Sequence, residues 1–255
     1  IRVACSGLAP SRPEGLPPYP TSMTRPLLFI LTCFLAFTTA SAQTMRIEVA
    51  QESAAGVGDF DANVLGSVDA YTTTGTVASY YQYNRGSSDR TANPDLRDFR
   101  NQVNTMFVVG SDGLGFITIH GPRRGGGSAG DLLASSQHDL SAGTFMSPLD
   151  VRDDPDDAND TFVFASGNTR LTASTNAGGS STDGFAARFT NEEPVILSQL
   201  LSFSNNVEGW TVHGTDGSSL SATPAVGRRV RFNVSWVVDE SQIPKDSKDY
   251  IPGQI

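Results

Sequence analysis

An acidic segment, DVRDDPDDAND (150–160), is the part of the sequence best suited to bind a metal ion. Calcium binds about six to eight oxygen ligands, and closely spaced carboxylates repel one another unless a cation or solvent screens them. We therefore predict a calcium site whose ligands come from Asp153, Asp154, Asp156, Asp157 and Asp160. The spacing matches no standard calcium loop and includes no glycine for a sharp turn, so a solvated surface loop is the alternative.

Aromatic residues in TVASYYQY (76–83) indicate a second kind of site. If this segment is a strand, Tyr81 and Tyr83 lie on one face, because side chains alternate along a strand. Two exposed rings would form a platform for the apolar side of a sugar, which Trp210 could extend. The alternative is that these rings are packing residues, as aromatic residues in strands commonly are.

A glycine-rich segment supplies the remaining candidates. Arg123 and Arg124 stand beside glycines whose amides can donate hydrogen bonds to an anionic glycan or a phosphate. GGSAG formally matches the nucleophile elbow and would make Ser128 a nucleophile. An elbow requires a strand that leads directly into the turn, and GPRRGG separates Ser128 from the preceding strand FITIH.

Short β-branched and aromatic runs between turn residues predict that these candidates are carried by strands. The predicted strands are MRIEVA, TVASYYQY, TMFVVG, GFITIH, TFVFAS, GFAARFT, PVILSQLLSF, GWTVHG and RRVRFNVSWVV. Gly-Ser/Thr-Asp-Gly turns predict hairpins over 108–117 and 211–220. Helices are predicted over 93–103, with Asn93 as N-cap, and over 130–143. The fold class is therefore all-β, an antiparallel β-sandwich with one or two short helices, for which a jelly roll is one possible connectivity.

The N-terminal part of the chain indicates export. Residues 23–42 have the pattern of a signal peptide, with Arg25, an apolar run over 27–37, and Ala40-Ser41-Ala42 before the expected cleavage. The run would span only about 16 Å as a helix, against about 30 Å for a hydrocarbon core, so we expect no membrane span in the mature chain. We interpret 1–22 as an upstream flank or spurious extension, 43–240 as a single sandwich domain, and 241–255 as a polar C-terminal tail, with truncation of the tail as one interpretation.

Charge and cysteine content narrow the class of protein. The net charge of −9 disfavours nucleic acids and anionic membranes as partners. Both cysteines, Cys5 and Cys33, precede the cleavage site, so the mature chain contains no disulfide and no thiol. The expected protein is secreted, periplasmic or attached to the cell surface.

Three functions are consistent with these features. The first is a non-catalytic domain that binds a glycan, a surface polymer or a neighbouring protein, stabilised by calcium. The second is a secreted glycan-active hydrolase that uses paired aspartates as acid and base. The third is a structural unit that assembles edge to edge.

The predicted cleavage can be tested by mass spectrometry of the exported protein. We expect a chain that begins at Gln43 and contains no cysteine, because the small residues at Ala40 and Ala42 suit a signal peptidase. A product that still contains Cys33 would contradict both the export signal and the absence of thiols.

Overall fold

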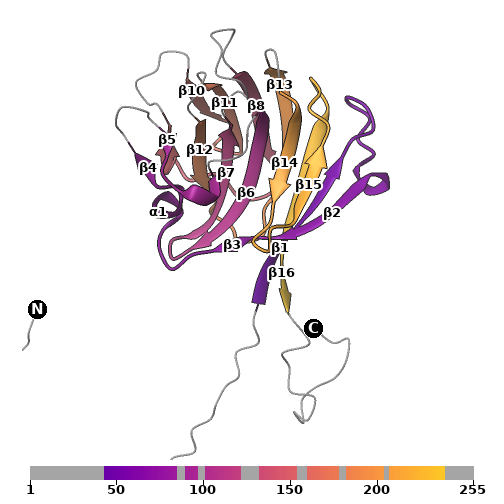
Figure 1. The fold of residues 1–255 in the computed structure, drawn as a ribbon. Helices are drawn as coiled ribbons and strands as arrows, with labels where there is room; N and C mark the ends of the chain where they lie inside the picture. Colours follow the sequence, from indigo (N-terminus) through magenta and orange to yellow (C-terminus); the bar gives the residue numbers. More distant parts are fainter. Residues whose placement is uncertain are drawn as a thin grey trace, which may run out of the picture. The chain divides into compact units, whose positions relative to one another are not determined.

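The computed structural model describes two packed β-sheets and one short α-helix. The described residues are 43–84, 90–96, 101–121, 132–153, 160–177, 182–203 and 207–238. The predicted all-β sandwich is confirmed, and Figure 1 shows the two layers. Among the described residues, no helix has both the length and the apolar character needed to cross a membrane.

The first sheet has the strand order β10-β11-β8-β13-β16-β1-β2 and is antiparallel throughout. In chain order its strands are β1 (Gln43–Gln51), β2 (Val64–Asp69), β8 (Leu132–Leu140), β10 (Thr161–Ala165), β11 (Arg170–Ala177), β13 (Val195–Phe203) and β16 (Arg229–Val238). Gln43 pairs with Val238, so β1 begins beside the end of β16.

The second sheet has the order β15-β14-β6-β7-β12-β9, and β3 also pairs with β6. Its strands are β3 (Tyr71–Thr72), β6 (Gln102–Gly110), β7 (Gly113–His120), β9 (Val151–Arg152), β12 (Asp183–Arg188), β14 (Gly209–His213) and β15 (Ser219–Ala222). Two pairings in this sheet, β14 with β6 and β3 with β6, are parallel, so the sandwich is not purely antiparallel. A separate small ribbon pairs β4 (Tyr83–Asn84) with β5 (Arg90–Thr91).

The predicted helices are only partly correct. A short 3₁₀ helix, η2 (Pro94–Leu96), begins where predicted, and the Asn93 side chain accepts a hydrogen bond from the Asp95 amide at 3.0 Å. Strand β6 begins at Gln102, so the helix predicted over 93–103 does not extend to its predicted end. The helix predicted over 130–143 is wrong, because Leu132–Leu140 is strand β8. Another 3₁₀ turn, η1 (Phe60–Ala62), follows β1.

The strand predicted at TVASYYQY is also wrong, because Val77–Tyr81 forms helix α1. The Thr76 hydroxyl caps this helix by accepting a hydrogen bond from the Ser79 amide at 3.0 Å. Val77 and Tyr81 then lie one turn apart on one face and pack against the outer side of the second sheet. Gly115 permits this contact, since a Cβ atom there would lie 2.4 Å from a methyl carbon of Val77.

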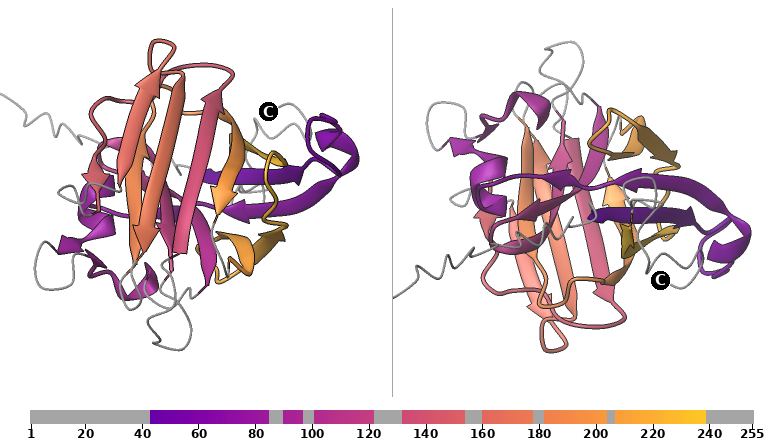
Figure 2. Two further views of the ribbon diagram at one scale, coloured as in Figure 1. Left: turned by 90° about the horizontal axis from the view of Figure 1, so that it is seen from above. Right: turned by 90° about the horizontal axis from the view of Figure 1, so that it is seen from below.

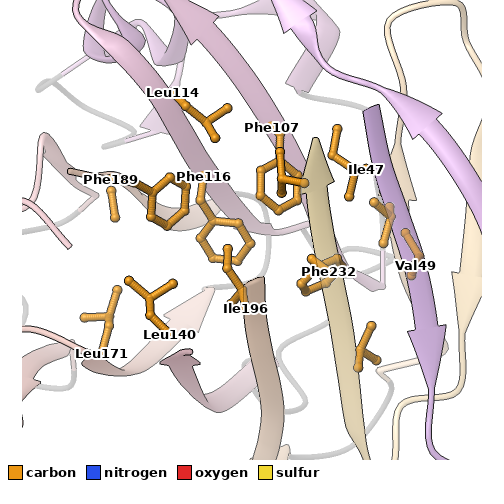
Figure 3. Close-up of a cluster of buried hydrophobic side chains, with 14 of the residues drawn as sticks. Ile47, Val49, Phe107, Leu114, Phe116, Leu140, Leu171, Phe189, Ile196 and Phe232 are labelled. Atoms are coloured by element: carbon orange, nitrogen blue, oxygen red, sulfur yellow. The ribbon is translucent and has the colours of Figure 1, made fainter. Parts of the chain in front are cut away.

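The main core lies between the sheets and is rich in phenylalanine. Figure 3 shows Phe116 between Phe107, Phe189 and Phe232, with aliphatic side chains around them. The Phe116 ring centroid is 5.4 Å from Phe107, 6.1 Å from Phe185 and Phe232, and 6.4 Å from Phe189. These separations are in the range of favourable aromatic pairs. Phe116 is therefore the centre of the contact between the sheets.

Truncation of this ring tests that role. Phe116→Ala should lower the free energy of unfolding by about 3–5 kcal/mol, because it removes buried contacts and leaves a cavity. Val226→Ala is the control, since Val226 is 62% exposed and its truncation should change the value by about 0.5 kcal/mol or less. Urea unfolding followed by circular dichroism measures both. Equal effects of the two substitutions would contradict the packing described here.

Candidate functional site: a buried polar cluster at one end of the sandwich

Four connections between strands begin at the same end of the sandwich, which we call the loop end. Here β7, β9, β11 and β13 end, and β8, β10, β12 and β14 begin. Gln43 and Val238 lie at the opposite end, because β16 runs away from the loop end. Figure 2 shows the same strands from above and below. Loops at one end of a rigid sandwich are a common location for binding residues.

The inward-facing positions of the strands become polar at the loop end. Phe116 and His120 both face the space between the sheets, because their separation of four residues preserves the alternation of a strand. His120 pairs across the sheet with Asp183, which therefore projects from the same face. From the opposite sheet, the Thr175 hydroxyl contacts His120 Nδ1. The two layers thus both contribute to one polar cluster.

Asp160 belongs to the same level of the sandwich. The rings of Phe162 in β10 and Phe185 in β12 pack at a centroid distance of 5.5 Å. Asp160 and Asp183 each precede one of these rings by two residues, so both are one inward position closer to the loop end. Both carboxylates are buried, as are His120 and Thr175.

His120 leaves one ring nitrogen available. Burial lowers the pKa of His120 to about 4, so the imidazole is neutral near pH 7. Its Nδ1 atom contacts Thr175, while Nε2 has no hydrogen-bond partner among the described residues although the side chain is 1% exposed. A neutral ring nitrogen in this position can meet a water molecule or another polar group that enters the cluster.

A second pair of residues adjoins the cluster from the outer side of the sheet. The Tyr81 hydroxyl donates a hydrogen bond to Asp153 Oδ2 at 2.7 Å, and both side chains are fully buried. The Asp153 amide donates to the carbonyl oxygen of Gly184 at 3.0 Å, next to Asp183. Burial, followed by the charges of Asp153 and Asp183, raises the pKa of Tyr81 well above its ordinary value. Tyr81 therefore stays protonated and acts as a hydrogen-bond donor.

The predicted aromatic platform does not form. Tyr81 is in α1 and is fully buried, whereas the neighbouring Tyr83 is in β4 and half-buried. Trp210 is enclosed between the sheets and donates its indole N–H to Thr105 Oγ1 at 2.9 Å. The rings of Tyr81 and Trp210 are therefore packing residues, which was the alternative given above. They cannot stack on a sugar at the surface.

The structure locates part of the predicted calcium loop. Asp153 and Asp160, at the two sides of this segment, are buried at the loop end. Asp154, Asp156 and Asp157 lie outside the described residues, as do Arg123, Arg124 and Ser128. Within the part of the chain that the structure describes, no three His, Cys, Asp or Glu side chains are grouped closely enough to hold a metal ion.

Sequence reasoning missed three residues of the cluster, His120, Thr175 and Asp183. The signal for His120 was its place in GFITIH, where it continues the inward alternation of Phe116. Asp183 precedes GFAARF, and no local pattern indicated that it would pair with His120. Gly184 accounts for the close approach there, because a Cβ atom on it would lie 2.2 Å from the carbonyl oxygen of Thr118.

The three histidines predict a loss of stability in mild acid. Burial lowers the pKa of His120 and His213 to about 4 and that of His138 to about 3, whereas an unfolded histidine titrates near pH ~6.5. The unfolded chain therefore binds more protons below that pH, and the free energy of unfolding should fall as the pH decreases from ~6.5 toward 4.

Urea unfolding at a series of pH values measures this effect, with a slope of up to about 1.4 kcal/mol per pH unit for each histidine. His138→Gln should reduce the slope by about the contribution of one group. His138 is a suitable site because its two nitrogens contact the hydroxyls of Ser136 at 2.8 Å and Ser198 at 2.6 Å. A free energy of unfolding that is constant between pH 7 and 5 would contradict the expectation.

Comparison with known proteins does not identify a family or a function for this chain. No protein-family model, curated protein or solved structure matches the chain. Its function must therefore be inferred from its own residues.

Proposed function

We propose that the chain is an exported, non-catalytic β-sandwich that binds a glycan, a surface polymer or a neighbouring protein through its loop end. Calcium at the acidic segment stabilises that end. The ligands of the ion include carboxylates of Asp153 and Asp160, with further oxygens from Asp154, Asp156 and Asp157 in the same segment.

The burial of Asp153 and Asp160 is the observation that carries this proposal. A solvated surface loop, the alternative for this segment, would leave both carboxylates in water, yet they are 0% and 7% exposed. Calcium prefers carboxylate oxygens and can share a buried carboxylate with a protein donor, such as the Tyr81 hydroxyl that donates to Asp153 Oδ2. Asp153 and Asp160 fit calcium by the chemistry of their oxygens, whereas the nitrogen of His120 suits a different class of metal.

The position of strand β1 supports export. Strand β1 begins at Gln43, the first residue after the expected cleavage site. Both cysteines precede this residue, and the contact between the sheets is made by packed aromatic and aliphatic side chains. A sandwich of this kind needs no disulfide outside the cytoplasm.

A glycan-active hydrolase is the second candidate, and one observation bears on it. Asp153 and Asp183 both influence Tyr81, so two carboxylates do lie near one ring. Paired acids of a glycosidase must meet the substrate, but these two side chains are 0% and 2% exposed. Their burial favours a role in shaping the binding end over direct catalysis.

Thermal unfolding with calcium or with a chelator tests the proposal. Calcium at about 100 times its dissociation constant should stabilise the protein by about 2.7 kcal/mol, and EDTA should remove this gain. Asp160→Asn should abolish the difference between the two conditions, and its own folding is checked by circular dichroism. Asp95→Asn is the control, because Asp95 is exposed and lies outside the acidic segment.

Isothermal titration with calcium chloride provides the binding isotherm directly. The proposal predicts a saturable signal in the wild-type chain and in Asp95→Asn that is absent in Asp160→Asn. Identical melting curves in calcium and EDTA, together with a flat titration of the wild-type chain, would remove calcium from the account.

A further inference from the structure

The edges of the two sheets differ in how well they are protected. Strand edges expose unpaired N–H and C=O groups, and proteins normally protect them with charges, prolines, bulges, short strands or covering segments. β9, one edge of the second sheet, is only two residues long. β2 and β15 lie next to each other: the Thr215 amide donates to the Asp69 carbonyl, and Leu220 approaches Gly66.

Within the described part of the chain, β10, the remaining edge, has none of these protections in its own residues, although the guanidinium carbon of Arg152 in β9 lies 5.4 Å from the centroid of the Phe162 ring. It runs TFVFA, five residues with no charge, no proline and no shift of register against β11. Among the described residues, no backbone hydrogen bond joins β10 to a strand other than β11. Thr161, Val163 and Ala165 are exposed, and Val163 is 54% exposed.

We propose that β10 is a self-association edge, on which a second copy of this chain adds its own β10 in antiparallel orientation. The two copies of the first sheet then become one continuous sheet across a two-fold axis. This inference is independent of the calcium site and of the ligand bound at the loop end.

A second copy fits this edge because β10 is complementary to itself. An antiparallel two-fold through Val163 places Val163 opposite its own copy and Thr161 opposite Ala165 of the partner strand. All of these contacts are uncharged, so they add no like-charge pair between two chains that each have a net charge of −9. The inner face of β10 is already anchored, since Phe162 packs on Phe185 and Phe164 on Phe145. A new strand therefore adds to an edge that is held in place.

Engineered cysteines test both the pairing and its register. In the full chain with Cys5→Ser and Cys33→Ser, Val163→Cys introduces a single thiol. At the two-fold axis the two Cα atoms would be about 4.5–5.5 Å apart, within the range that a disulfide spans. Val163→Cys should form a disulfide-linked dimer at least about tenfold faster than Val226→Cys, although Val226 is the more exposed residue. A mixture of Thr161→Cys and Ala165→Cys proteins should yield mainly the mixed dimer.

Sedimentation of the unmodified chain provides a test without cross-linking. We expect the mean mass to rise from monomer toward dimer with concentration, and Val163→Lys to weaken the association at least tenfold, because two lysines would face each other. Val226→Lys should leave the association unchanged. A wild-type chain that remains monomeric at high concentration, or a Val163→Cys protein that cross-links no faster than Val226→Cys, would overturn the proposal.

Discussion

The packing of Phe116 against rings from both sheets is the interaction on which the rest of the structure depends. Phe107 and Phe185 belong to the same sheet as Phe116, whereas Phe232 comes from β16 in the opposite sheet. Strand alternation then determines which residues face inward, since every second residue of β7, β12 and β16 points toward this layer. Because no cysteine follows Cys33, the sandwich depends on such packing for its stability.

The same alternation explains why chemistry gathers at the loop end. Closer to the loop end than the phenylalanines, the inward positions are His120 at the end of β7 and Asp183 at the start of β12, and Asp160 occupies the corresponding position before β10. These residues are buried because the aromatic layer holds the two sheets together. On the outer side of the second sheet, Tyr81 donates a hydrogen bond to Asp153. The sandwich thus places acidic groups at the loop end, whereas the start of β1 at Gln43 and the end of β16 at Val238 lie at the opposite end.

Sequence patterns predicted the sandwich and most of its strands because alternation is a local property, and RVRFNVSWVV displays it clearly. The error at Val77–Tyr81 arose because β-branched and aromatic residues favour strands, while the Thr76 cap and the one-turn spacing of Val77 and Tyr81 favoured a helix. The error at Leu132–Leu140 has the converse cause. Ala134, Ser136, His138 and Leu140 alternate inward, but small and polar residues conceal that period. The pairing of His120 with Asp183 joins residues 63 positions apart, so no local pattern could reveal it.

Native-state hydrogen exchange measures most directly whether the aromatic layer holds the sheets together. If it does, amides of β7 and β16, which carry Phe116 and Phe232, should exchange only by global unfolding, with a free energy equal to that from urea unfolding. Amides of the short edge strand β15 should exchange through smaller local openings. Faster exchange in β7 and β16 than in β15 would show that the sheets separate without unfolding the molecule, and would contradict this account.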